Sequence, residues 1–142
     1  MDFFTALDVS GTGMSAERVR VNVASSNLAN ADTTRGPNGQ PYRRMDPVFE
    51  AVPMMAPDGQ IGGASEPPGV RVSQIISDPN PGKRIYSPGH PDADAQGFVT
   101  LPNVNPVHEV VNLLSASRSY EANATAVETL KGMAQRGLDI AR

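Results

Sequence analysis

The sequence contains no cysteine and no tryptophan, and its only aromatic residues are three tyrosines and four phenylalanines. The absence of cysteine excludes a disulfide framework and a thiolate metal site. The small number of rings leaves little large apolar surface to bury. We therefore expect a thin hydrophobic core.

An excess of positive charge and long apolar runs are lacking as well. The net charge is −3 at pH 7, whereas a nucleic-acid-binding domain needs a basic surface. No apolar run approaches the roughly 18 residues that a membrane-spanning helix requires. The first ten residues, MDFFTALDVS, carry two aspartates and no basic residue, which argues against a cleavable secretory signal. We expect no nucleic-acid partner, no direct membrane span and no signal peptide.

Proline is absent from both ends of the chain. All 13 prolines lie between Pro37 and Pro106. Proline inside a helix costs about 3 kcal/mol, so the two ends can form long helices and the middle cannot. The predicted fold is α+β. It has an N-terminal helix and its terminator in residues 1–35, a β-rich insert full of proline and glycine in residues 36–104, and a C-terminal helix in residues 105–142.

Apolar residues recur every seven positions in both ends, which predicts a stripe along one side of a helix. The N-terminal repeat consists of Leu7, Met14, Val21 and Leu28, and it predicts a helix over residues 4–29. The C-terminal repeat includes Leu113, Tyr120 and Val127, with Leu138 widening the stripe, and it predicts a helix over residues 107–141. Asn105 is the expected N-cap of that second helix. We expect the two helices to pack as an antiparallel, coiled-coil-like pair.

The middle of the chain predicts short strands separated by turns. The candidate strands are residues 48–52, 70–76 and 98–101. Pairs such as Asn38-Gly39 and Pro88-Gly89 favour turns between them. Since apolar residues lie between the turns, we expect a small antiparallel β-unit rather than disorder.

Two long helices with a thin core bury little surface by themselves. At about 25 cal/mol per Å² of apolar surface, such a monomer would be only marginally stable. Alanine-rich flanks would let further helices approach closely, so copies stacked around an axis would supply the missing burial. This indicates an assembly protein, and a self-sufficient helical hairpin with a decorated loop is the alternative.

The one cluster with potential chemistry is SPGHPDAD, residues 87–94, which contains His90, Asp92 and Asp94. A histidine beside two carboxylates can bind a metal or transfer protons. The spacing matches neither an EF-hand nor a zinc pattern. Two prolines make the run a rigid turn, in which Asp side chains commonly bond backbone amides. We favour the turn, and we predict no catalytic, cofactor or metal site.

The stretch SSNLANADTT, residues 25–34, lies where the first helix must end before Pro37. Asn30 tolerates the left-handed conformation that ends many helices. Asp32 and the threonines after it would bond open backbone groups. Asn27 lies one turn earlier, and its amide can donate and accept across a joint between helices, which would fix the register of an assembly.

SSNLANADT after an N-terminal helix resembles the signature of the bacterial flagellar rod, hook and hook-associated axial proteins. Within that family, residues 7–51 and 86–141 resemble the two halves of the proximal rod proteins of the C type. The stretch HPDADAQGFVTLPNVN followed by SRSYEAN carries the more specific part of this resemblance.

The resemblance implies a structural subunit without enzyme activity. Such proteins are exported unprocessed through the flagellar type III apparatus and build the rod of the basal body, which crosses the periplasm and transmits torque to the hook. The implied partners are further copies, the other proximal rod proteins, the distal rod protein and the adaptor between rod and membrane ring. The residues expected at subunit interfaces are Leu7, Met14, Val21, Asn27, Leu28, Asn30, Asp32, Leu113, Tyr120, Val127 and Leu138.

Two other functions remain open from the residues alone. A cell-wall- or carbohydrate-binding module would use the insert as its binding face, although the insert offers only the rings of Tyr42, Phe49, Tyr86 and Phe98. A metal-dependent enzyme would depend on His90 and its two neighbouring aspartates.

Overall fold

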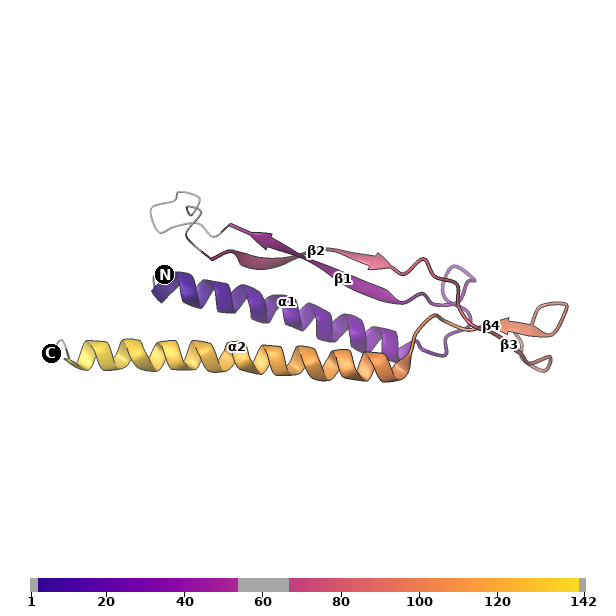
Figure 1. Ribbon diagram of the computed structural model, residues 1–142. Coiled ribbons are helices and arrows are strands. Elements are labelled where there is room, and N and C mark those ends of the chain that lie inside the picture. Colours follow the sequence, from indigo (N-terminus) through magenta and orange to yellow (C-terminus); the bar gives the residue numbers. More distant parts are fainter. Residues whose placement is uncertain (1–2, 54–66, 141–142) are drawn as a thin grey trace. The chain divides into compact units, whose positions relative to one another are not determined.

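The computed structural model describes residues 3–53 and 67–140. Its elements follow the order α1 (Phe3–Ala29), β1 (Met45–Val52), β2 (Gly69–Ser77), β3 (Arg84–Tyr86), β4 (Phe98–Thr100) and α2 (Pro106–Ile140) (Figure 1). The strands form two separate two-stranded sheets, β1–β2 and β3–β4. The predicted α+β organisation, with terminal helices and a small antiparallel β region between them, is confirmed.

Both helices begin and end within a few residues of the predicted bounds. Asn105 is the N-cap of α2, because its Oδ1 accepts from the backbone amides of Val107 at 3.0 Å and His108 at 3.4 Å. The helix α1 continues through two glycines. A Cβ on Gly13 would lie 3.0 Å from Nδ2 of Asn123, so the missing side chain leaves room for α2 there.

The end of α1 depends on the side chain of Asn30. Among the described residues, only glycines have a positive φ, so Asn30 is not left-handed. Instead its side-chain Nδ2 donates to the carbonyl of Ser26 at 2.9 Å, and its Oδ1 accepts from the Thr33 hydroxyl at 3.2 Å. The Ser26 carbonyl also accepts from the Asn30 backbone amide at 3.1 Å, so the side chain adds a second hydrogen bond at the end of the helix.

Two of the predicted strands are confirmed in β1 and β2, which are longer than expected, and the third corresponds to β4. The strand β3 was not predicted, because three residues are too short to show an alternating pattern. It pairs antiparallel with β4, with Ile85 opposite Val99. Gly97 turns the chain before β4 with a φ of +82°, and a Cβ there would lie 2.9 Å from the Tyr86 ring.

The chain divides into two compact units. Unit 1 comprises Met1–Val19, Val48–Gln74 and Ser115–Arg142, and unit 2 comprises Arg20–Pro47 and Ile75–Leu114. The buried apolar side chains of the described residues are small in number and size, which confirms the expected thin core. They are Ala16 and Ala116 in unit 1, and Val23, Ala24 and Val99 in unit 2.

Buried polar residues accompany this thin core. Thr5 lies in unit 1, and Asn27 and Glu109, each 1% exposed, lie in unit 2. No helix within residues 3–53 and 67–140 combines the length and the apolar character needed to cross a membrane.

Candidate functional site

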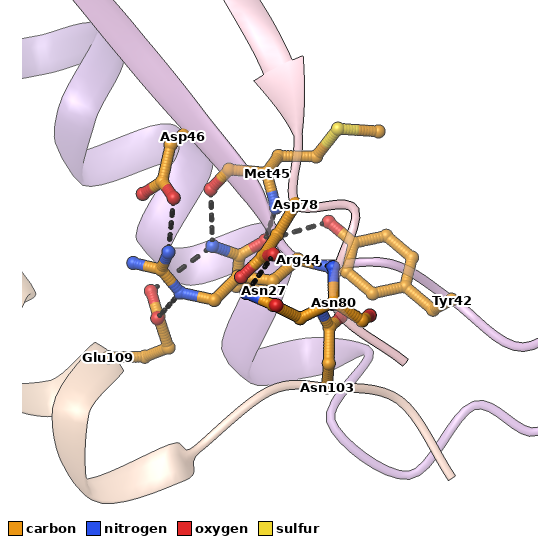
Figure 2. Close-up of polar contacts among 9 residues, drawn as sticks. All are labelled: Asn27, Tyr42, Arg44, Met45, Asp46, Asp78, Asn80, Asn103 and Glu109. Carbon is orange, nitrogen blue, oxygen red and sulfur yellow. Dashed lines mark hydrogen bonds and ion pairs between the residues drawn. The ribbon is translucent and has the colours of Figure 1, made fainter. Parts of the chain in front are cut away.

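The most completely bonded site of unit 2 is a buried polar cluster, which we define as Asn27, Tyr42, Arg44, Met45, Asp46 and Glu109 (Figure 2). Three segments supply it: the last turns of α1, the chain entering β1, and the first turn of α2. It therefore joins parts of the sequence that are up to 82 residues apart.

Asn27 stands at the centre of the buried polar cluster. Its Nδ2 donates to the Met45 carbonyl at 2.8 Å and to Oε2 of Glu109 at 3.1 Å. Its Oδ1 accepts from the Met45 amide and from the Tyr42 hydroxyl, each at 2.9 Å. A side-chain amide has two donor hydrogens and two acceptor lone pairs, so Asn27 is fully bonded by its own chain.

Glu109 carries the buried negative charge. Its Oε1 accepts from Nε of Arg44 at 2.7 Å, and its Oε2 accepts from Asn27. The Arg44 side chain is 22% exposed and also pairs with Asp46. Taking two charges out of water costs several kcal/mol each, and this cost is offset only when the remaining donors and acceptors are bonded. Here both carboxylate oxygens have a partner, which meets that condition.

The electrostatics of Arg44 follow from this arrangement. Desolvation by burial lowers the pKa of the guanidinium, but the hydrogen bond from Arg44 to Glu109 and the charges of Asp46 and Glu109 more than offset it. The pKa of Arg44 is therefore raised above its ordinary value. A permanently charged, forked donor suits a fixed carboxylate partner better than a lysine would.

The backbone of Arg44 extends the bonding to the loops before and after the β3–β4 hairpin. Its amide donates to Oδ1 of Asn103 at 2.8 Å, and its carbonyl accepts from the Asp78 amide at 2.8 Å. Asn103 in turn donates to the Asn80 carbonyl at 3.2 Å. Figure 2 shows these three residues grouped around the start of β1.

A second polar joint within unit 2 ties the segment after α1 to the turn before β4. Asp92 accepts from the Thr34 hydroxyl at 2.7 Å through Oδ2, and its Oδ1 pairs with Arg35 at 2.7 Å. The SSNLANADTT stretch thus ends a helix, and its last residue, Thr34, together with Arg35 anchors the insert through Asp92.

The candidate metal ligands are used by the turn itself. The Asp92 amide donates to Nδ1 of His90 at 3.0 Å. Asp94 accepts from the amides of Gln96 and Phe98, each at 2.9 Å, and pairs with Arg84. The backbone bonds expected for a rigid turn are therefore confirmed. In the part of the chain that the structure describes, no three histidine, cysteine or acidic side chains form a group that could hold a metal ion.

An apolar stripe lies exposed on the first turns of α2, within unit 2. It consists of Val107, Val110, Val111 and Leu114, which are 70%, 43%, 58% and 56% exposed. Their spacing of three and four residues puts them on one face of the helix. At 3.6 residues per turn, that face is the one opposite Glu109. We call these four residues the exposed stripe.

Unit 1 contains a groove of about 590 Å³ between α1 and β2. Its apolar lining includes Leu7, Gly11, Ala16, Val70 and Val72, and Asp8 and Arg71 supply charge. The Val70 amide donates to the Thr12 hydroxyl oxygen at 3.2 Å beside it. Leu7, a predicted interface residue, is thus placed in this groove.

The other predicted interface residues are distributed over both helices. Met14, Val21, Leu28, Leu113 and Val127 are half-buried, whereas Tyr120 and Leu138 are 41% and 72% exposed. Asp32 is exposed, and Asn30 is bonded within the end of α1. Only Asn27 belongs to the buried polar cluster, and the joint that it serves in this structure is within one chain. The subunit contacts of all these residues stay a prediction.

The sequence reasoning missed Tyr42, Arg44 and Glu109. A detectable signal was present at Glu109, because it interrupts the valines of VHEVV, together with His108, at the start of a helix. Its partners lie 65 and 82 residues away, and a local pattern cannot supply them.

Comparison with known proteins assigns the class. The family model "Flagella basal body rod protein" matches residues 7–37, and the model "Flagellar basal body rod FlgEFG protein C-terminal" matches residues 95–140. The two matches cover most of α1 and all of α2, including Asn27 and Glu109. The class is therefore that of the flagellar basal body rod proteins.

Curated relatives narrow the class. The chain is 44% identical to the flagellar basal-body rod protein FlgC of Yersinia enterocolitica and to that of Salmonella typhimurium, over 99% of this chain and 98% of each relative. It is 42% identical to FlgC of Bacillus subtilis over the full length of both. The chain belongs to the FlgC family of flagellar basal-body rod proteins. This family consists of structural proteins, which confirms the expectation that the chain is not an enzyme.

Proposed function

We propose that the chain is a structural subunit of the proximal rod of the flagellar basal body and that it polymerises with other rod proteins. Full-length similarity to FlgC proteins supports the rod assignment. The observation that carries the assembly mechanism is the exposed stripe. Leaving four large apolar side chains of one helical face in water is unfavourable by about 25 cal/mol per Å², and a neighbouring subunit would remove that cost.

The two helices are proposed to pair as an antiparallel coiled coil. In unit 2, Asn27 of α1 contacts Glu109 of α2, and in unit 1, Gly13 lies against Asn123. Asn27 follows Gly13 by 14 residues, and Asn123 follows Glu109 by 14 residues, so each unit supports the same antiparallel offset. Fourteen residues correspond to two heptads of a coiled coil.

The proposed partners are copies of this chain, the other proximal rod proteins, the distal rod protein and the adaptor between rod and membrane ring. The proposed location is the periplasmic part of the basal body, reached through the flagellar type III export apparatus without a cleavable signal. Family membership supports assembly with rod components in general. A wall- or carbohydrate-binding module is not supported, because FlgC similarity accounts for the whole chain.

The test is to place charge on the exposed stripe. Val110→Glu combined with Leu114→Glu should abolish swimming and incorporation into purified basal bodies in a strain that lacks its own copy. Both side chains are exposed in the single chain, so its circular dichroism should be unchanged and export should continue. Ser115→Glu, an exposed position on the same helix, is the matched control and should swim. Normal swimming by the double variant would contradict the proposal.

A further inference from the structure

The buried polar cluster of unit 2 does more than hold its three segments together. We propose that Asn27, Arg44 and Glu109 determine the register of α2 along α1, so that the helices can pair at one offset only. The inference concerns the single chain and stands without the proposed function. The apolar residues of the helices would be replaceable in this role, whereas the three polar residues would not.

The first argument is the consequence of a shift. Sliding α2 by one helical turn toward the start of α1 would place Glu109 against Val23 or Ala24, which are 8% and 3% exposed and have no hydrogen-bonding side chain. A slide the other way would carry it past Ala29, where α1 ends. In both cases Glu109 would lose its amide donor, and Nδ2 of Asn27 would lose one of its two acceptors. Leaving buried polar groups unbonded is strongly unfavourable.

The second argument is that apolar packing alone discriminates poorly between offsets. The buried apolar residues of the two helices are alanines and one valine, which differ little in shape from one turn to the next. Similar small residues would meet after a slide. A single buried polar residue in an apolar helix interface is a known means of fixing register at some cost in stability.

The third argument is that the buried polar cluster is anchored from outside the helices. Asn27 bonds both the amide and the carbonyl of Met45, and Arg44 reaches Glu109 from the neighbouring position. The start of β1 is therefore held to the end of α1, which fixes the position of the Arg44 guanidinium along α1. Both carboxylate oxygens of Glu109 are bonded only when the first turn of α2 lies level with that position.

The register also decides which face of α2 is exposed. Glu109 points into the buried polar cluster, and the exposed stripe occupies the opposite face of the same turns. Rotating α2 to follow a slide would turn part of the stripe away from solvent. If the proposed function holds, the same three residues orient the surface that meets a neighbour.

The chain has no cysteine, so introduced cysteines report register without background. Gly13→Cys is combined in turn with Ala116→Cys, Tyr120→Cys, Asn123→Cys, Val127→Cys and Leu130→Cys in the full-length chain. Each purified double variant is oxidised, and disulfide formation is followed by non-reducing gel and mass spectrometry. The native register predicts that the 13–123 pair dominates, because a Cβ at position 13 lies next to Asn123.

The decisive background is Arg44→Met combined with Glu109→Leu. An apolar pair in place of a buried ion pair is often neutral or stabilising, so helix content should persist. The disulfide yield of the 13–123 variant, relative to the yields at the neighbouring positions, should fall at least about fivefold. This factor corresponds to about 1 kcal/mol, the contribution of one buried hydrogen bond. An unchanged pattern would show that packing sets the register and would overturn the proposal.

Glu109→Gln is the second background, because it keeps the shape and removes the charge. A smaller shift in the same direction supports the proposal. Loss of the helical signal in both backgrounds would make the buried polar cluster a stabilising element only, and it would also overturn the proposal. Swimming tests the proposed function separately. If Val110→Glu combined with Leu114→Glu swims normally, the role of the exposed stripe is contradicted and the register proposal is unaffected.

Discussion

The two units of this chain fix their geometry by different means. In unit 2 the buried polar cluster joins three segments through buried, hydrogen-bonded side chains, with Glu109 and Asn27 each 1% exposed. In unit 1 the clearest polar link between strands, Arg71 to Glu50, is 62% and 51% exposed at its two side chains. Unit 1 also exposes Met133, Leu138 and Ile140, which are 52%, 72% and 87% exposed. Both units therefore offer apolar surface that neighbours can cover, but the buried polar cluster that fixes the arrangement of segments lies in unit 2.

The largest effect that would test this comparison comes from removing one acid in each unit. Glu109→Ala should destabilise unit 2 by about 3–5 kcal/mol, because it breaks a buried ion pair and removes one hydrogen-bond acceptor each from Arg44 and Asn27. Glu50→Ala, the matched control, should cost less than about 1 kcal/mol, because its ion pair with Arg71 is exposed. Hydrogen exchange of the Arg44 and Met45 amides measures the first change, and exchange of strand amides in β2 measures the second. Equal costs would remove the distinction between the units.

A middle-sized effect is expected from the two glycines of α1 in unit 1. A Cβ at Gly11 meets no atom within 4 Å, so Gly11→Ala should stabilise the helix by about 0.5–1 kcal/mol through helix propensity. A Cβ at Gly13 meets Asn123 Nδ2 at 3.0 Å, so Gly13→Ala should gain nothing or lose slightly. Thermal unfolding followed by circular dichroism distinguishes the two. Equal gains would show that α2 does not approach Gly13.

The smallest effect concerns the turn before β4. The hydrogen bond from the Phe98 amide lowers the pKa of Asp94 below its ordinary 3.8, burial opposes this, and the Gln96 amide and Arg84 lower it further. A lowered pKa in the folded chain means that the contribution is complete above the ordinary value and is lost as the pH falls through the folded value. Protection of the Phe98 amide, measured against the intrinsic exchange rate at each pH, should therefore fall below about pH 4, with Asp94→Asn showing less change. An equal loss of protection in both would assign the effect to another group.

Much of the fold could be predicted because it depends on local chemistry. Proline placement separated the helices from the insert, and Asn105 was recognised as an N-cap from its position before Pro106. The strand β3 was not predicted because three residues are too few to show the two-residue period of a strand. Asn30 was expected at the helix end, but its way of ending the helix could not be predicted, because an asparagine can act either through its backbone or through its side chain and the sequence does not distinguish the two.

The site was less predictable, for two physical reasons. The seven-residue repeat pointed to large side chains such as Leu7 and Met14, yet the buried positions of α1 include Ala16, Val23 and Ala24, because small residues permit close approach. The repeat records hydrophobicity, whereas burial also depends on size. In addition, the bonds of Glu109 and Arg44 connect distant segments, and only Asn27, inside a recognisable stretch, could be singled out beforehand.

The pairing of Arg44 with Glu109 has a consequence for how the chain responds to salt water. Mobile ions weaken attraction between charges that face the solvent, but they act much less on charges enclosed by protein. The position of α2 against the start of β1, which this pair holds, should be the same in a dilute medium and in brine. A rod protein built around such a pair would keep this part of its structure in either medium.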